Sequence, residues 1–135
     1  MDSDFEEIGQ HINFIKHNGG LKLKKITESE YQFRATVSDI HTNAGGSAHG
    51  GFIMTLLDSG MGNASHRSLG PGGQSATISL DVKFISAAKV DDVIIGTAWV
   101  MKKTRSLIFM RGELRCGETL IATGEGVWKR LSPRA

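Results

Sequence analysis

The sequence has little of several features that mark specialised classes of protein. Its 135 residues contain one cysteine, Cys116, so no disulfide can form within the chain. No apolar run approaches the roughly 20 residues that a membrane-spanning helix needs. The acidic first residues do not resemble the apolar core of a signal peptide. We therefore expect a protein of the cytoplasm, with Cys116 as a small buried apolar side chain.

Charge of either sign is not in excess. Sixteen Lys and Arg residues stand against fourteen Asp and Glu, which gives a net charge of +2. This weak imbalance argues against nucleic acid or a membrane surface as a partner. Two prolines and the absence of a low-complexity tract argue against a disordered chain. The length is typical of one domain, and we expect residues 1–135 to form a single one.

Glycine, by contrast, is abundant. The chain has 17 glycines, well above the usual frequency of about 7%. Several of them lie inside stretches whose pattern otherwise predicts a helix or a strand. Glycine at such positions indicates that backbone closely approaches other backbone or a ligand.

Hydrophobic periodicity predicts two helices and six strands. The first helix is expected from Asp4 to His17, where apolar residues including Ile12 recur at near-helical spacing, and Asn18-Gly19-Gly20 should end it. Strict alternation from Thr77 places Ile78, Leu80, Val82 and Phe84 on one strand face, opposite Ser79, Asp81 and Lys83. The other expected strands are Leu21–Ile26, Tyr31–Val37, Asp92–Lys102, Ser106–Cys116 and Thr119–Lys129.

The segment from His49 to about Arg67 has a different pattern. Its apolar residues, Met54 among them, cover most of a helical wheel, which predicts a long buried helix. The links between the last three strands are too short for crossover helices, so these strands should be antiparallel. We predict an α+β fold, with a curved antiparallel sheet wrapped around one long central helix and a short helix before it.

A glycine-rich loop from Asn43 runs into this helix through His49-Gly50-Gly51. Helix N-termini carry unpaired N–H groups and a partial positive charge, and such donors can stabilise an oxyanion. Further along, Thr55, Asp58, Ser59 and Gly62 follow helical spacing and form one polar or small stripe. A carboxylate in a buried helix is costly unless it is hydrogen-bonded or used in catalysis. Asp58 is therefore a candidate catalytic group.

Helix geometry separates these two features. Gly50 and Asp58 are eight residues apart, about 12 Å along a helix at 1.5 Å per residue. A reacting carbonyl should lie about 3 Å from both the oxyanion donor and the nucleophile. If both groups act on one carbon, they must come from different subunits. The spacing thus predicts a homodimer with two composite sites.

The segment from His49 to Gly62 (HGGFIMTLLDSGMG) resembles the central helix of hotdog-fold thioesterases of the phenylacetate-degradation (PaaI-like) type. That group is similar to aryl-CoA thioesterases and to the human thioesterase-superfamily acyl-CoA hydrolases. The resemblance extends from the first helix to Trp128, and the element order agrees with it. It implies hydrolysis of an aryl- or fatty acyl-CoA to free acid and CoA.

By the same resemblance, Asp58 is the nucleophile or general base, and the Gly50 backbone N–H is the oxyanion donor. Asn43 corresponds to the amide that helps to hold the thioester or water. Thr77 corresponds to a hydroxyl on the strand after the helix, with Ser75 and Ser79 as alternatives. His49 is expected to shape the turn and to hydrogen-bond within it rather than to act as the base. Many relatives pair dimers, so a homodimer or a homotetramer is expected.

The resemblance implies that coenzyme A is part of the substrate, and we expect no cofactor. Lys102, Lys103 and Arg105, around the hairpin before Ser106, are candidates for its phosphates, although a solubilising turn explains them equally well. The histidines show no metal-ligand spacing, so we expect no metal.

Two rival functions stay open. A hydratase of the same fold would carry a histidine five residues after the catalytic acid, where this chain has Asn63. A non-catalytic acyl-CoA-binding regulatory module is the second alternative. Such modules usually carry a DNA-binding domain, for which this chain has neither spare length nor a basic patch. The acyl group, and the choice between CoA and a carrier protein, cannot be read from the sequence.

Overall fold

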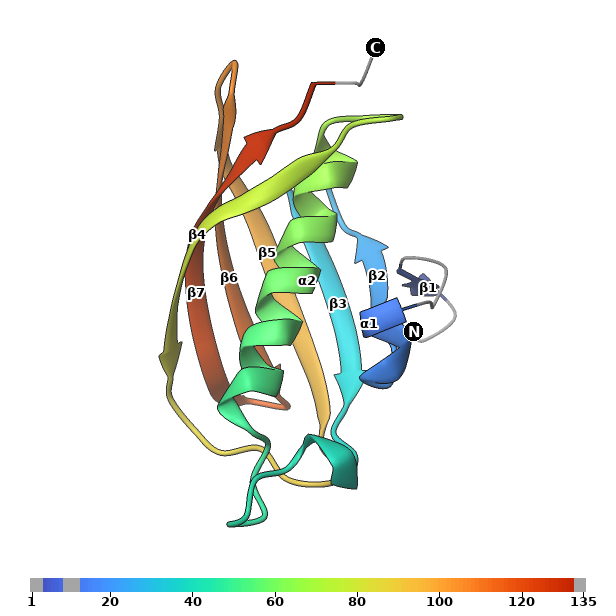
Figure 1. The fold of residues 1–135 in the computed structure, drawn as a ribbon, viewed down its shortest axis with the longest axis vertical. Coiled ribbons are helices and arrows are strands. Elements are labelled where there is room, and N and C mark those ends of the chain that lie inside the picture. The colour runs from blue at the N-terminus through green and yellow to red at the C-terminus, as the bar shows by residue number, and fades with distance from the viewer. Residues whose placement is uncertain (1–3, 9–12, 133–135) are drawn as a thin grey trace.

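The computed structural model describes residues 4–8 and 13–132, in which seven strands, two α-helices and one short 3-10 helix follow one another (Figure 1). Their bounds are β1 (Glu6–Glu7), α1 (Asn13–His17), β2 (Lys22–Lys25), β3 (Glu30–Thr36), η3 (Asp39–His41), α2 (Gly50–Ser68), β4 (Ser75–Phe84), β5 (Val93–Lys103), β6 (Leu107–Cys116) and β7 (Thr119–Arg130).

The strands form one antiparallel sheet in the order β1-β2-β3-β5-β6-β7-β4. Helix α2 lies along one face of this sheet, and the sheet curves around it (Figure 1). The predicted α+β fold, its antiparallel strands and its single long helix are therefore confirmed. Strand β4 follows α2 in sequence but lies at the sheet edge, beside β7. In the part of the chain that the structure describes, no helix is long and apolar enough to cross a membrane.

The N-terminal segment differs from the prediction of one helix over Asp4–His17. Glu6 and Glu7 pair with β2 as a short strand, and among the described residues of this segment the α-helix covers Asn13–His17. Ile12 lies outside the described residues. Ile8 is 3% exposed and belongs to the core, so the chain gains both strand hydrogen bonds and apolar burial by extending here. The predicted stop is confirmed, since the Gly20 N–H donates to the Ile15 carbonyl.

Glycines allow α2 to pack closely on the sheet. The Phe33 ring of β3 lies between Gly60 of α2 and Gly96 of β5, and a Cβ on either glycine would come within 2.5 Å of that ring. Met61 of α2 packs over Gly112 and Gly124, which are paired neighbours in β6 and β7; a Cβ would lie 2.8 Å from the Met61 sulfur on Gly112 and 3.4 Å on Gly124. This arrangement confirms the inference that glycines inside regular elements mark a close approach of backbone.

Helix α2 is not buried on all sides, which corrects the expectation drawn from its apolar wheel. Its sheet-facing side chains, such as Leu57 and Met61, are fully buried. Met54 is 41% exposed, and Asp58 is exposed as well. The sheet can cover only one side of the helix, so the side that carries Met54 and Asp58 stays open in the single chain.

Strand β4 contains a β-bulge that overturns the predicted strict alternation. Pairing with β7 shifts register between Thr77 and Ser79, so that Ile78 is an extra residue. Before the bulge, Ser75 and Thr77 face α2; after it, Leu80 and Val82 pack against the core instead. Such a bulge bends a strand and redirects its side chains. Thr77 therefore faces the helix, whereas strict alternation would turn it away.

The packing of Phe33 predicts a sharp difference between two strand glycines. Gly96→Ala places a Cβ 2.1 Å from a Phe33 ring carbon and should lower the free energy of unfolding by about 1–3 kcal/mol through overpacking. Gly124→Ala also faces α2, but its Cβ would be 3.4 Å from the flexible Met61 side chain and should be nearly neutral. Urea unfolding of both variants measures the difference. Equal stabilities would contradict this account of the packing.

Candidate active site

The first turn of α2 leaves one backbone donor free. His49 is the N-cap residue: its Nδ1 accepts from the Gly51 N–H at 2.8 Å, and its carbonyl accepts from the N–H groups of Phe52 and Ile53. Within the described residues, the Gly50 N–H has no hydrogen-bond acceptor. The hydrogen bond predicted for His49 within its turn is thus present. The imidazole acts as a helix cap, and the Gly50 amide is the group left for a ligand.

Phe84, at the end of β4, lies beside Gly50. A Cβ built on Gly50 would come 3.4 Å from the ring, in ordinary contact, and the ring itself is 57% exposed. Sequence analysis did not single out Phe84, because strand alternation alone cannot show which residue reaches the start of the helix. Gly50 therefore has an aromatic side chain as its neighbour.

Asp58 lies two turns further along α2 and is held by β4. The Thr77 hydroxyl donates to Asp58 Oδ1 at 2.7 Å. The two alternative hydroxyls do not make this contact. Ser75 is buried and bonds to Ser65 Oγ, while Ser79 lines a hollow on the far face of the sheet. Of the three candidates, the structure brings only Thr77 to Asp58.

Asn43 organises the loop before α2. Its Oδ1 accepts from the N–H groups of Gly45, at 2.9 Å, and Ser47, at 3.2 Å. Its backbone N–H donates to the Ser47 carbonyl, which closes the loop. The side-chain oxygen is therefore used inside the loop, and the exposed Nδ2 group is the part of Asn43 that can donate to a substrate or water.

One chain does not bring the two halves of the site together. Gly50 and Asp58 are both in α2, and eight residues of helix separate them by about 12 Å. The structure therefore assembles two partial clusters: Gly50 with Phe84, and Asp58 with Thr77.

The basic hairpin lies at the far end of α2. Lys103 Nζ donates to the Ser68 carbonyl at 2.7 Å, so this cation caps the C-terminal end of the helix. Lys102 and Arg105 are exposed beside it. Figure 1 shows the β5–β6 turn at the same end as the last turn of α2, away from the loop that carries Asn43.

Two further titratable side chains, His66 and Cys116, lie outside these two clusters. Burial lowers the pKa of His66, which favours its neutral form. Cys116 is half-buried and packs against the core, close to what was expected of it. In residues 4–8 and 13–132, no three His, Cys, Asp or Glu side chains lie together as metal ligands would.

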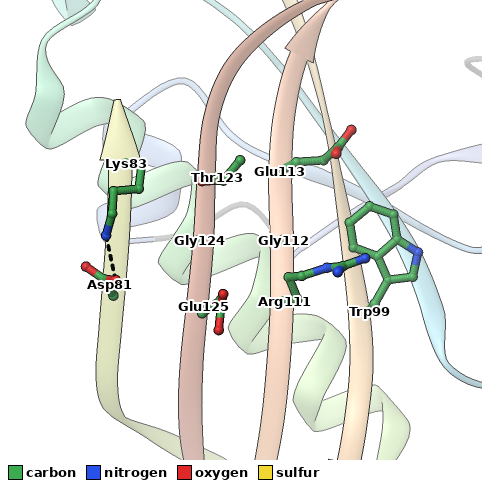
Figure 2. Close-up of a pocket in the computed structure, with 9 residues that line it drawn as sticks. All are labelled: Asp81, Lys83, Trp99, Arg111, Gly112, Glu113, Thr123, Gly124 and Glu125. Atoms are coloured by element: carbon green, nitrogen blue, oxygen red, sulfur yellow. Dashed lines mark hydrogen bonds and ion pairs between the residues drawn. The ribbon is translucent and has the colours of Figure 1, made fainter. Parts of the chain in front are cut away.

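A hollow of about 460 Å³ lies on the sheet face that points away from α2. Figure 2 shows Arg111 over the Trp99 ring, at 5.0 Å from its centroid, and Lys83 paired with Asp81 at 2.7 Å. Both cations thus already have partners in the chain. The strands separate this hollow from α2, so it is not the space in which Gly50 or Asp58 would act (Figure 2).

Comparison with known proteins identifies the family. Residues 45–123, more than half of the chain, match the model of the thioesterase superfamily. The chain belongs to this superfamily. The matched span contains Gly50, Asp58 and Thr77. Family membership confirms the resemblance seen in the α2 segment and the prediction that the protein is an enzyme, a thioester hydrolase.

Relatives and solved structures agree with this thioesterase assignment. Human acyl-coenzyme A thioesterase 13 is 31% identical over 117 residues, which cover 83% of this chain and 81% of that protein. A conserved protein of Pseudomonas aeruginosa has a TM-score of 0.83 and 27% identity, over 92% of this chain and 98% of that one. A variant of the phenylacetic acid degradation protein PaaI of Thermus thermophilus has a TM-score of 0.78 and 25% identity, over 87% and 98%.

The bulge at Ile78 makes a testable distinction between two hydroxyls of β4. Thr77→Val keeps the side-chain shape but removes the donor to Asp58, and it should lower kcat for thioester hydrolysis by roughly tenfold, because hydrogen bonds to charged groups are the stronger class. Ser79→Ala, on the far face of the sheet, is the matched control and should leave kcat unchanged. Steady-state assays of thiol release check both. A larger loss in Ser79→Ala than in Thr77→Val would mean that the bulge does not turn Thr77 toward Asp58.

Proposed function

We propose that this thioesterase hydrolyses acyl-CoA thioesters to the free acid and CoA. The observation that carries the proposal is the pair of partial clusters on α2: a carboxylate held by Thr77 on the open side of the helix, and a first-residue N–H that has no acceptor among the described residues. The name of the human relative, an acyl-coenzyme A thioesterase, supports CoA as the leaving group. Exposed Met54 and Phe84 beside these clusters favour an apolar acyl group.

The active unit in this proposal is a homodimer, alone or as a pair of dimers. Strand β4 is a ten-residue edge strand, and an edge with free N–H and C=O groups is suited to pairing. Ile78, Phe84 and Ile85, in and just after this strand, are each more than half exposed. A second copy that covers β4 and the open side of α2 would bury this apolar surface. It would also bring Gly50 of one chain to Asp58 of the other.

In the mechanism we propose, Asp58 acts by one of two routes. As a nucleophile, its carboxylate oxygen bonds to the thioester carbon, the C–S bond breaks, and CoA leaves as a thiolate that takes up a proton; water then cleaves the mixed anhydride. As a general base, Asp58 takes a proton from a water molecule whose oxygen attacks the same carbon; the C–S bond then breaks, and the proton passes to the departing CoA thiolate. In both routes Thr77 orients the carboxylate, Asn43 Nδ2 holds the substrate or water, and the Gly50 N–H stabilises the oxyanion with the helix dipole.

The rival functions differ in the product that an assay would detect. A regulatory module would bind acyl-CoA without releasing thiol, and a hydratase would change the acyl group without cleaving the thioester. A hydratase would carry its histidine at position 63. Here Asn63 donates its side-chain N–H to the Ser59 carbonyl, a hydrogen bond within α2. A cytosolic location stays the expectation drawn from the sequence.

The main test is thiol release from a panel of aryl-, short-chain and long-chain acyl-CoAs. Wild type should turn over at least one of them. Asp58→Asn and Asp58→Ala should abolish turnover while the protein stays folded, because Asp58 is exposed and contributes little to the core. Wild-type-like hydrolysis by Asp58→Asn would refute the role of Asp58.

Gly50→Pro tests the oxyanion donor within the same experiment. Proline is favoured at the first position of a helix, where it lacks only the N–H in question. The preceding residue, His49, has φ −62° and ψ 139°, which suits a residue before proline. We expect kcat to fall by about 10²–10³, the usual cost of one lost oxyanion donor. Gly50→Ala keeps the N–H and should lose far less.

Mixing the two defects tests the composite site. A dimer of one Asp58→Asn chain and one Gly50→Pro chain has one site with both groups intact if each site draws on both chains. Random pairing should then restore about a quarter of wild-type activity, since half of the dimers are mixed and each has one good site. No restoration in purified mixed dimers would show that each site is built from one chain.

The basic hairpin makes a separate prediction for the CoA end of the substrate. The double variant Lys102→Ala, Arg105→Ala should raise KM for acyl-CoA several-fold while kcat stays the same, because phosphate contacts are made equally in the ground and transition states. The control is a short thioester of the same acyl group without phosphates, whose KM should not change. An equal rise in KM for both substrates would argue against phosphate binding here. Lys103 is left intact because it caps α2.

A further inference from the structure

The proposed mechanism does not use the buried imidazole of His41, although this ring contacts three other segments of the chain. His41 is 4% exposed and ends the short helix η3, two residues before Asn43. Its ring is stacked on Phe52, in the first turn of α2, with centroids 3.7 Å apart and planes 9° from parallel. Gly19, with φ +95°, lies against the ring, where a Cβ would be only 3.2 Å from Cε1.

Two backbone groups determine which nitrogen of this ring carries the proton. The Ser38 N–H donates to Nδ1 at 2.9 Å, and a backbone N–H can only donate, so Nδ1 carries no proton. The proton is therefore on Nε2, which donates to the Asn18 carbonyl at 2.7 Å. Asn18 follows α1, so one imidazole joins the end of α1, the start of η3 and the first turn of α2.

The backbone of His41 continues this connection to the site. Its carbonyl accepts from the His49 N–H at 2.7 Å, directly before Gly50. The loop between these two residues carries Asn43 and is closed by the pairing of Thr42 with Ala48. Both ends of the loop are thus attached to His41: one by the chain itself and the other by this hydrogen bond.

We propose that His41 is a positioning residue for the oxyanion donor and for the Asn43 loop. It touches no substrate. Its ring holds η3 to α1 and to Phe52, and its carbonyl holds His49, so together they fix where the Gly50 N–H points. This role rests on the proposed function, since it matters for catalysis only if Gly50 and Asn43 act on a thioester.

The ring contacts can be separated by substitution. His41→Phe keeps a flat ring for the stack on Phe52 but leaves the Ser38 N–H and the Asn18 carbonyl without partners. His41→Asn loses the stack and the contact to Asn18, but it keeps an acceptor near the Ser38 N–H. Ile108→Ala is the control, because it removes a fully buried core side chain at the β5–β6 turn end of β6, away from the first turn of α2.

The experiment measures kcat and KM by thiol release at a temperature at which every variant is folded. A misplaced catalytic group costs up to about 100-fold in rate, so His41→Phe should lower kcat at least tenfold with little change in KM. His41→Asn should recover part of that loss. Ile108→Ala should lose stability but keep its kcat. An unchanged kcat in His41→Phe, or an equal loss of kcat in Ile108→Ala, would overturn the proposal.

Hydrogen exchange gives a readout that does not depend on activity. In His41→Phe, amides of residues 42–52 should exchange at least about tenfold faster than in the wild type, while those of β6 and β7 stay protected. Unchanged exchange over 42–52 would overturn the positioning role by itself. If the wild type cleaves no thioester in the panel, the proposed function fails, and the exchange result still decides whether His41 holds this segment.

Discussion

The close packing of α2 on the sheet is the constraint on which the site depends. Phe33 fills the space between Gly60 and Gly96, and Met61 lies over Gly112 and Gly124. Because these contacts leave no room for a Cβ on Gly60 or Gly96, they fix the rotation of α2 about its own axis as well as its distance from the sheet. That rotation turns the buried side chains of α2 to the sheet and leaves Asp58 facing β4, within reach of a strand side chain. The excess of glycine is therefore a condition for the geometry of the site.

The bulge in β4 is the second feature that positions Asp58. Regular alternation would send Thr77 to the same face as Asp81, away from α2. One extra residue, Ile78, reverses the alternation, so that Thr77 reaches Asp58 while Val82 and Phe84 still face the helix side further along. A single strand thus supplies a hydrogen-bond donor to the Asp58 carboxylate and an aromatic side chain beside Gly50.

Much of this could be predicted from the sequence, and the failures have physical reasons. The long helix, the antiparallel order and the residues Gly50 and Asp58 follow from local periodicity and spacing. The bulge does not, since Ile78 has no local signal and only the pairing with β7 reveals it. The exposure of Met54 could not be predicted. An apolar residue on a helix indicates that its side chain is buried, but its own chain or a second chain can provide the burial. The sequence suggested no role for His41 beyond that of a possible metal ligand. Its stacking on Phe52 and its hydrogen bond to Asn18 join residues that are distant in sequence, so no local pattern indicates them.

The sequence His49-Gly50-Gly51 can be understood as a way to leave one donor free at a helix start. The first turn of a helix presents four N–H groups. His49 alone satisfies three of them, the N–H of Gly51 through its ring and those of Phe52 and Ile53 through its carbonyl. The fourth belongs to Gly50, which has no side chain and lies beside Phe84. Since this donor is about 12 Å along the helix from Asp58 of its own chain, a role for both groups in one reaction requires a second chain. In the proposed mechanism, the same short segment therefore supplies the oxyanion donor and makes a second chain necessary.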